Sequence, residues 1–216
     1  MKKKEIALED RATAGERLFS PSAARNRDVI GSVLIKYMPA TGVILEVGSG
    51  TGEHAVHMAQ LLPGVRWLPG DPDPDSRASI AAWTAHAGLE NVSPPHSIDV
   101  SGNRWDGIQD GECSGIVSIN MIHIAPFSAA RGLIAGAGRY LKQGGALFLY
   151  GPFSRNGQHT APSNEDFDAS LKSRDAAWGV RDLENDLLPL AYDAGLKVEA
   201  VVDMPANNLS VILRKS

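Results

Sequence analysis

The segment at residues 43–52 constrains the fold more than any other part of this chain. It begins with the apolar run 43–47, interrupted only by Glu46, and continues into a loop with glycine at every second position. Glycine lacks a Cβ, so its backbone can turn sharply and approach a ligand closely. A helix is expected at about 53–62, and its first amide groups would point at whatever lies over the loop. A strand, a glycine loop and a helix in this order are typical of a nucleotide-type cofactor site in an open α/β sheet.

Strand and helix patterns alternate along the rest of the chain. Short apolar runs follow helical stripes of apolar residues, and proline, glycine or other turn residues separate them. Strands are expected at 42–47, 65–69, 92–98, 115–120, 146–150, 197–203 and 209–214, and helices at 24–37, 53–62, around 80–87, 129–141 and 183–194. This alternation predicts an α/β fold of the doubly wound, Rossmann-like kind, with a mostly parallel seven-stranded sheet and an antiparallel last strand.

The chain divides into an N-terminal arm and one domain. Its 216 residues fit a single ordinary domain. Residues 1–24 are polar and contain alanine, so they are expected to form the arm, with 25–216 as the domain. Ser22 or Asn26 is expected to cap the first helix. The long polar stretch 151–181 interrupts the alternation, and such stretches in compact domains are often lids or substrate loops.

Composition excludes several classes of function. The net charge of −4 gives no electrostatic bias toward nucleic acid or acidic membranes. Cys113 is the only cysteine, which excludes an intrachain disulfide and a multi-cysteine zinc site. His54 and His57 lack the intervening glutamate of a zinc-binding H-E-x-x-H helix, so no metal is expected. No apolar run reaches the length of a membrane span, and the N-terminus lacks the apolar centre of a secretory signal. We therefore expect a cytoplasmic protein with no nucleic-acid or membrane partner, whose oligomeric state the sequence does not set.

The glycine spacing argues against a dinucleotide ligand. A dinucleotide-binding loop follows G-x-G-x-x-G or G-x-G-x-x-A, which places the third small residue at position 53 when the count starts at Gly48. That position is Glu53, and the glycines follow G-x-G-x-G instead. A glutamate at the head of the helix would lie close to a pyrophosphate and repel it. S-adenosylmethionine has no phosphate and carries a cationic sulfonium, so acidic neighbours are compatible with it.

The same segment resembles the first motif of the class I S-adenosylmethionine (SAM)-dependent methyltransferases. The resemblance runs from Glu46 through Gly48, Ser49 and Gly50 to Gly52. It implies that these residues bind SAM, the donor of the methyl group that such an enzyme transfers to its acceptor.

The chain continues to resemble this superfamily in the expected order, over about residues 25–216. Asp71 ends the second strand, where the superfamily places an acid that accepts hydrogen bonds from the ribose hydroxyls. Asp99 and Val100 follow the third strand, where an acid often lies near the adenine amino group. Asn120 ends the fourth strand, beside the methionine part of the cofactor. The resemblance therefore implies that these residues complete the SAM site.

Four further motifs resemble those of a narrower family of uncharacterised, methyltransferase-like proteins. They are Ser-Pro-Ser-Ala-Ala-Arg-Asn at 20–26, Tyr-Gly-Pro-Phe at 150–153, Ser-Asn with Phe-Asp within 163–168, and Met-Pro-Ala-Asn-Asn at 204–208. We call these the four motif segments. That family has no agreed substrate, so the likeness strengthens the fold and cofactor predictions and does not identify the acceptor.

His123 and Tyr150 are the candidate catalytic residues. Both lie where a strand ends at the carboxyl edge of the sheet, outside which ligands bind in open α/β folds. A neutral imidazole at His123 could take a proton from an N–H or O–H group of the acceptor, and Tyr150 could point its hydroxyl into the site. The sequence leaves open whether His123 instead bonds to the local backbone, and whether Tyr150 is simply a buried aromatic residue.

Arg25, Asn26, Asn164 and Trp178 are the candidate substrate-binding residues. Arg25 and Asn26 would either fold over the cofactor or form the polar side of the first helix. Asn164 is ambiguous in the same way, and Trp178 would either line an acceptor pocket or pack in the core. With these residues, the N-terminal arm and the 151–181 segment are expected to form the acceptor side of the site.

The predicted function is transfer of a methyl group from SAM to an unidentified small-molecule acceptor. In-line displacement from a sulfonium has an excellent leaving group, so the protein mainly has to hold donor and nucleophile close, aligned and dry. A non-catalytic SAM-binding or interaction protein is the first alternative, and an NAD-dependent oxidoreductase is the second. The sequence identifies neither the acceptor nor the atom that is methylated.

Overall fold

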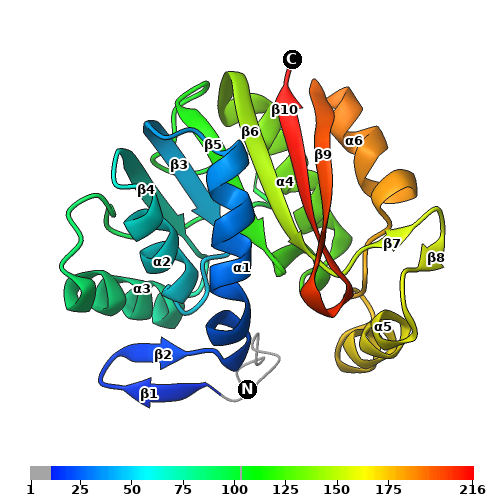
Figure 1. The fold of residues 1–216 in the computed structure, drawn as a ribbon, viewed down its shortest axis with the longest axis horizontal. Coiled ribbons are helices and arrows are strands. Elements are labelled where there is room, and N and C mark those ends of the chain that lie inside the picture. Colours follow the sequence, from blue (N-terminus) through cyan, green and yellow to red (C-terminus); the bar gives the residue numbers. More distant parts are fainter. Residues whose placement is uncertain (1–10, 103) are drawn as a thin grey trace.

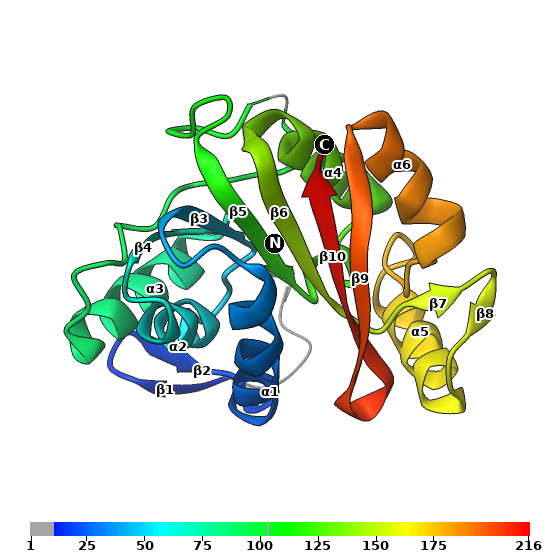
Figure 2. The same cartoon turned by 45° about the horizontal axis from the view of Figure 1, so that its top comes forward.

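The computed structural model describes residues 11–102 and 104–216. Its centre is a six-stranded sheet with the strand order β4-β3-β5-β6-β10-β9 (Figures 1 and 2). The strands are β3 (Gly42–Val47), β4 (Val65–Gly70), β5 (Cys113–Ile119), β6 (Leu141–Gly151), β9 (Leu196–Met204) and β10 (Asn208–Lys215). β10 is antiparallel to both of its neighbours, and the other pairs are parallel. The expected Rossmann-like sheet, mostly parallel with an antiparallel last strand, is confirmed.

The expected strand at 92–98 is the exception. This segment runs beside β4 but pairs with it only through isolated parallel bridges at Val92 and His96. Pro94 and Pro95 lie between the bridges and have no amide hydrogen to donate to a ladder. The sheet therefore has six regular strands rather than the expected seven, with an interrupted segment beside β4 in the seventh place.

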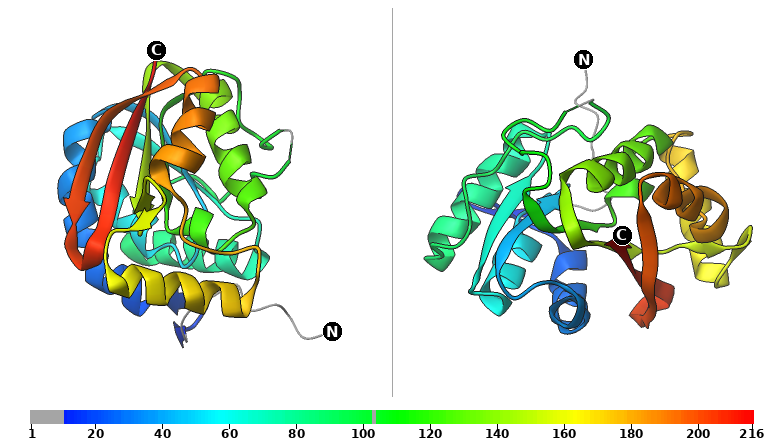
Figure 3. Two further views of the ribbon diagram at one scale, coloured as in Figure 1. Left: turned by 90° about the vertical axis from the view of Figure 1, so that its right-hand side faces the viewer. Right: turned by 90° about the horizontal axis from the view of Figure 1, so that it is seen from above.

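Helices cover both faces of the sheet (Figure 3). They are α1 (Pro21–Tyr37) and α2 (Glu53–Leu61) on one face, α4 (Phe127–Tyr140) and α6 (Leu188–Asp193) on the other, and α3 (Pro74–Ala87) beside α2. Successive side chains of a strand point to opposite faces, so Ile44 of β3 joins the core under α1 and α2 while Leu45 joins the core under α4. This doubly wound arrangement buries both faces and leaves the strand ends free for a site.

Shorter elements complete the fold. They are the hairpin β1 (Ala12–Ala14) and β2 (Arg17–Phe19), the 3-10 turns η1 (Met121–His123) and η3 (Pro205–Asn207), the hairpin β7 (Ser154–Arg155) and β8 (Gln158–His159), α5 (Pro162–Arg174) and the π-helical turn η2 (Leu183–Leu187). The 151–181 segment, expected as a polar lid, therefore contains a hairpin and a helix.

The N-terminal segment is more structured than the arm expected over 1–24, of which residues 1–10 lie outside the described part of the chain. The β1–β2 hairpin docks on α3 (Figure 1). The Leu18 amide donates to Ser79 Oγ at 2.8 Å, and Trp83 Nε1 donates to the Leu18 carbonyl at 2.8 Å. The hairpin thereby lies at the edge of the sheet where the parallel strands end.

Helix α1 begins earlier than expected. Ser20 is its N-cap, because the Ser20 hydroxyl accepts from the Ala23 amide at 3.2 Å and Pro21 occupies the first helical position. The expected caps, Ser22 and Asn26, instead lie inside the helix.

Candidate functional site

Two adjoining cavities lie at the carboxyl edge of the parallel strands. The first, which we call the loop cavity, has a volume of about 480 Å³ and is lined by the glycine loop after β3. The second, the amide cavity, has a volume of about 700 Å³ and is lined by several asparagine side chains. Ser22, Asn120 and Ile124 line both cavities. The two cavities therefore adjoin at these shared residues.

The three glycines of the loop have left-handed backbones, with φ of 72° at Gly48, 56° at Gly50 and 91° at Gly52. A Cβ at Gly48 would lie 2.6 Å from Met121 Cγ, and a Cβ at Gly52 would lie 2.8 Å from Ile80 Cα. The packing therefore leaves no room for a side chain at these two positions. A Cβ at Gly50 would meet only a guanidinium nitrogen of Arg11, at 3.6 Å. Gly50 is therefore the position at which bare backbone faces the loop cavity.

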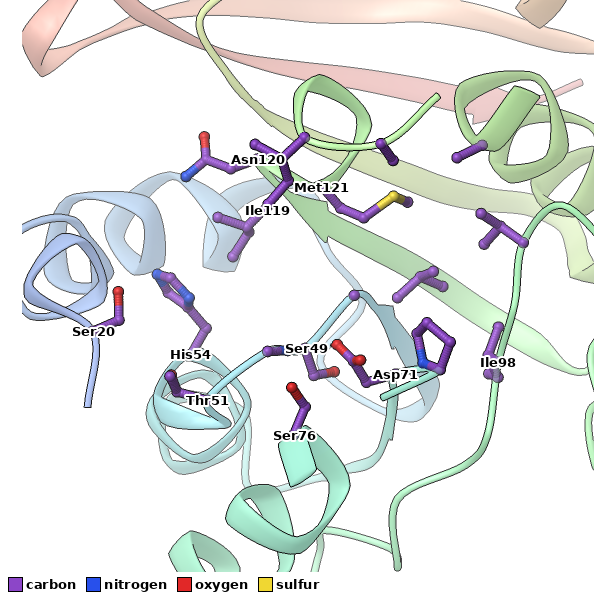
Figure 4. Close-up of a pocket in the computed structure, with 18 of the residues that line it drawn as sticks. Ser20, Ser49, Thr51, His54, Asp71, Ser76, Ile98, Ile119, Asn120 and Met121 are labelled. Atoms are coloured by element: carbon purple, nitrogen blue, oxygen red, sulfur yellow. Dashed lines mark hydrogen bonds between the residues drawn. The ribbon is translucent and has the colours of Figure 1, made fainter. Parts of the chain in front are cut away.

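Asp71 follows β4 and lies directly beside this loop (Figure 4). Its Oδ2 accepts from the Gly50 amide at 2.9 Å, and its Oδ1 accepts from the Asp73 amide at 2.9 Å. Burial raises the pKa of the Asp71 carboxyl above its usual value, while these two amides lower it. The carboxylate keeps lone pairs for further donors, which is what a pair of ribose hydroxyls requires.

The far end of the loop cavity is largely apolar. Ile98, Val100, Met121 and Ala129 are among the residues that line it. Asp99 lies at the exposed rim, where its Oδ1 accepts from the Ser101 amide at 2.8 Å. Apolar walls with an acid at the rim suit a flat aromatic base with an exocyclic amino group.

Two residues expected to bind the cofactor do not line the loop cavity. Strand alternation turns the Glu46 side chain toward β4, where its carboxylate accepts from Trp67 Nε1 at 3.1 Å. Glu46 is 2% exposed, and burial raises its pKa to about 7. Gly52 caps α2 and packs against Ile80. Both residues therefore contact the protein beside the glycine loop, outside the lining of the loop cavity.

Glu53 also differs from its expected position. Its carboxylate accepts from the Ser20 amide at 2.6 Å and from the Thr51 hydroxyl at 3.0 Å, and its side chain does not line the loop cavity. Any repulsion of a pyrophosphate by this carboxylate would therefore act from behind Ser20 and Thr51, which line the cavity. Glu53 instead ties the start of α1 to the loop.

His54 and Asn26 connect the two cavities. His54 lines the loop cavity, and its Nε2 lies 2.8 Å from Asn26 Oδ1, while Asn26 lines the amide cavity. Burial lowers the pKa of His54 to about 4, so its imidazole is neutral at pH 7. A neutral imidazole adds no positive charge to the end of the loop cavity that adjoins the amide cavity.

The four motif segments converge on the amide cavity, although they are far apart in the sequence. Residues from each of them line it: Ser22, Arg25 and Asn26; Tyr150 and Pro152; Ser163, Asn164 and Phe167; and Pro205, Ala206, Asn207 and Asn208. Three of the four candidate substrate-binding residues are in this set. The fourth, Trp178, lines the loop cavity instead, beside Asp175.

His123 lies in the wall of the amide cavity and is 1% exposed. The Arg181 amide donates to its Nδ1 at 3.3 Å, which leaves the ring proton of the neutral imidazole on Nε2. Burial, helped by the positive charge of Arg181, lowers the pKa of His123 to about 3. A general base works best when its pKa lies near the working pH, so this environment does not favour that role.

Tyr150 is 3% exposed and lies in the same wall. Its hydroxyl shares a hydrogen bond with the Asn26 side chain, and burial raises the pKa of the phenol above its usual value. At neutral pH the group is therefore a phenol that can donate a hydrogen bond to an acceptor molecule.

Arg181 is a structural residue whose role was not evident in the sequence. Its Nε donates to the Ile122 carbonyl at 3.0 Å, and a terminal nitrogen donates to the carbonyls of Ala125 at 2.7 Å and Ala177 at 2.9 Å. It thereby fixes the loop after β5, which includes the shared residue Ile124. The partners of Arg181 are backbone carbonyls, so the residue types at those positions do not reveal the contacts.

In the described part of the chain, no helix is both long enough and apolar enough to cross a membrane. The same residues include no cluster of three or more His, Cys, Asp or Glu side chains arranged to hold a metal ion.

Comparison with known proteins places this geometry in context. The profile of the family described as "Protein of unknown function (DUF938)" matches residues 17–215.

Solved structures share the fold, and methyltransferases are among them. TnmH is 18% identical with a TM-score of 0.71, over 90% of this chain and 56% of TnmH. An O-methyltransferase family protein from Burkholderia thailandensis is 16% identical with a TM-score of 0.71, over 89% of this chain and 60% of that protein. Geranyl diphosphate C-methyltransferase from Streptomyces coelicolor A3(2), solved with Mg²⁺, geranyl diphosphate and S-adenosyl-L-homocysteine, is 10% identical with a TM-score of 0.70, over 89% of this chain and 80% of that protein. This chain thus spans less than two thirds of the first two proteins, and its fold is that of the class I methyltransferases.

Proposed function

We propose that this chain, which belongs to the DUF938 family of proteins of unknown function, is a SAM-dependent methyltransferase that acts on a small-molecule acceptor. The observation that carries the proposal is the pairing of Gly50 with Asp71 at the floor of the loop cavity. A backbone without a side chain approaches the ligand there, and a buried carboxylate beside it can accept from ribose hydroxyls. The amide cavity then holds the acceptor next to the methionine end of SAM.

The residues of the loop cavity fit SAM along its whole length. Asp71 and Gly50 would hold the ribose, and the apolar walls at Val100 and Met121 would hold the adenine, with Asp99 at the rim. The methionine part would reach Asn120, where the two cavities adjoin. This assignment places the sulfonium beside the acceptor cavity and away from solvent.

Methyl transfer from SAM depends more on the alignment of donor and acceptor than on acid–base groups of the protein. When bound, SAM supplies an electrophilic methyl carbon: a lone pair of the acceptor bonds to that carbon, the carbon–sulfur pair stays on the resulting thioether, and the acceptor's proton leaves to solvent. The chain's own contribution is to align the two ligands at Ser22, Asn120 and Ile124 and to exclude water there. His123 and Tyr150 act in this proposal as neutral groups of the acceptor wall.

A small acceptor is supported by the volume of the amide cavity and by a structural neighbour. A volume of about 700 Å³ lies within the usual range of small-molecule sites, about 300–1,000 Å³. The solved geranyl diphosphate C-methyltransferase has the same fold and acts on a small molecule. The net charge of −4 gives no support to a nucleic-acid substrate.

Two measurements test the proposal. Isothermal titration calorimetry should show one molecule of S-adenosylhomocysteine binding per chain, while a fluorescence titration with NADH should show no binding. Incubation with SAM carrying a deuterated methyl group should then transfer the label into a component of a metabolite extract. Binding of NADH in place of S-adenosylhomocysteine would favour the oxidoreductase alternative. Binding of S-adenosylhomocysteine without any label transfer would favour a non-catalytic SAM-binding protein.

A further inference from the structure

The amide cavity has a charge distribution that the loop cavity does not share. Arg25 is the one side chain with a formal charge at neutral pH among the described residues that line the amide cavity, and none of them is Asp or Glu. The loop cavity, by contrast, is lined by Asp71, Asp99 and Asp175, with Arg11 as its cation. The two cavities therefore favour ligands of opposite charge, although they adjoin.

Arg25 is available to a ligand. Its terminal nitrogen donates to Ser22 Oγ at 3.2 Å, and both Arg25 and Ser22 line the amide cavity. No ion pair joins Arg25 to a carboxylate among the residues that the structure describes, whereas Arg66, Arg139 and Arg155 each pair with one. A guanidinium offers several donors in a planar fork, which is the geometry that binds carboxylates and phosphates.

The asparagines of the amide cavity add a second requirement for a ligand, which concerns its hydrogen bonds. The Asn164 amide nitrogen donates to Thr160 Oγ1 at 2.9 Å and to the Asn207 carbonyl at 2.9 Å. The Asn208 amide nitrogen donates to the carbonyls of Pro205 at 3.1 Å and Ala206 at 3.3 Å. Carbonyl groups accept only, so these contacts fix the orientation of both amides. These contacts use the amide nitrogens, so the side-chain oxygens of Asn164 and Asn208 are left as the groups that could accept hydrogen bonds from a ligand.

From these observations we propose that the amide cavity selects a small anionic acceptor molecule that also carries O–H or N–H groups. The anion, a carboxylate or a phosphate, pairs with Arg25, and the donor groups bind the amide oxygens of Asn164 and Asn208. A cationic amine is disfavoured because it would lie beside the guanidinium and would find no carboxylate in the wall. This inference rests on the proposed methyltransferase function and specifies its substrate class.

The test follows a deuterated methyl group from SAM into a metabolite extract and separates the products by ion exchange at pH 7. Labelled products should bind the anion exchanger. Phosphatase treatment should then abolish that binding if the anion is a phosphate ester and leave it unchanged if the anion is a carboxylate. Label found only in the neutral or cationic fractions overturns the proposed substrate class alone. Absence of label in every fraction overturns the methyltransferase function and this inference with it.

Variants of Arg25 test the role of the guanidinium with the labelled fraction as substrate. Arg25→Gln should raise the amount of that fraction needed for half-maximal rate by about tenfold, and Arg25→Lys should raise it less, because it keeps the charge and loses the fork. The affinity for S-adenosylhomocysteine should not change in either variant.

Arg66→Gln is the matched control. It removes the same charge from an exposed side chain of β4 that pairs with Glu112 and lines neither cavity. This control should behave as the unaltered protein does. Equal half-saturation for Arg25→Gln, Arg66→Gln and the unaltered protein would overturn the assignment of Arg25. Because Arg25 is exposed on α1, thermal melting should show that Arg25→Gln still folds.

Discussion

Within the glycine loop, residues of one type serve different purposes. Gly48 and Gly52 lack the space for a Cβ because Met121 and Ile80 pack against them. Gly50 has that space, so its lack of a side chain matters for what enters the loop cavity and not for the packing of the protein. The shared G-x-G-x-G pattern therefore combines a folding requirement with a binding requirement.

This distinction predicts the effect of Gly50→Val. A β-branched residue at φ of 56° is strained, so the free energy of unfolding should fall by about 1–3 kcal/mol. The added methyl groups would enter the loop cavity, so the affinity for S-adenosylhomocysteine should fall at least about a hundredfold, or about 2.7 kcal/mol. Urea unfolding measures the first effect, and calorimetry measures the second.

Gly88→Val is a control with the same backbone strain. Gly88 ends α3 at φ of 64°, and no atom lies within 4 Å of a Cβ built there. It should lose a similar free energy of unfolding and keep its affinity for S-adenosylhomocysteine. Equal affinity in both variants would contradict the placement of the ligand over Gly50.

At the scale of elements, the segment after β6 is held firmly in place. Asp182 accepts from the Ser154 hydroxyl at 2.9 Å, the Gly157 amide at 2.7 Å and the Asn185 amide at 2.8 Å. Glu184 adds contacts to Arg155 at 2.5 Å and to the Asn156 amide at 3.0 Å. The β7–β8 hairpin is therefore tied to η2 and is not a free polar loop.

We expect Asp182→Ala to release this hairpin. The substitution leaves the Gly157 amide and the Ser154 hydroxyl without their acceptor, which should cost about 1–3 kcal/mol of the free energy of unfolding. Amide hydrogen exchange should increase over residues 154–159. In the control variant Asp110→Ala, which breaks an exposed pair with Arg139, the loss should be much smaller because water screens that pair. Unchanged exchange over 154–159 in Asp182→Ala would show that other contacts hold the hairpin.

At the scale of the whole molecule, the sequence predicted the sheet well. Periodic apolar runs indicate burial directly, so the sequence predicted the strands and their mostly parallel arrangement. The interrupted segment at 92–98 is explained by the prolines at 94 and 95. The spacing of Gly50 and Asp71 was also informative, because both residues follow strands that end at the same edge.

Other features depend on contacts between distant segments, which no local pattern records. The capping role of Ser20 is one case, since Ser22 and Asn26 offered equally good local signals. The buried state of His123 is another, because it arises from Arg181 and Phe153, which lie far along the chain. The sequence could place His123 at the edge of the sheet and could not show that the fold lowers its pKa.

Three ionisable groups, His123, His54 and Glu46, make the free energy of unfolding depend on pH, and their contributions oppose one another. His123 has a folded-state pKa of about 3, below the unfolded value of about 6.5, so the unfolded chain binds an extra proton between these values and stability falls as the pH falls. His54 acts in the same direction, with a folded-state pKa of about 4. Glu46 acts in the opposite direction, because its folded-state pKa of about 7 lies above the unfolded value and the folded protein then holds the extra proton.

Between pH 6 and pH 5 the two histidines outweigh Glu46, so the free energy of unfolding should fall with decreasing pH. Each group that differs by a full proton contributes a slope of about 1.4 kcal/mol per pH unit. His123→Gln should flatten the profile by about that slope, and Glu46→Gln should steepen it by the same amount. Urea unfolding at pH 7, 6 and 5 measures these slopes, and comparing variants cancels the carboxylates common to all of them. A slope for His123→Gln equal to that of the unaltered protein would mean that His123 takes up its proton without unfolding, which its burial against Phe153 and Arg181 opposes.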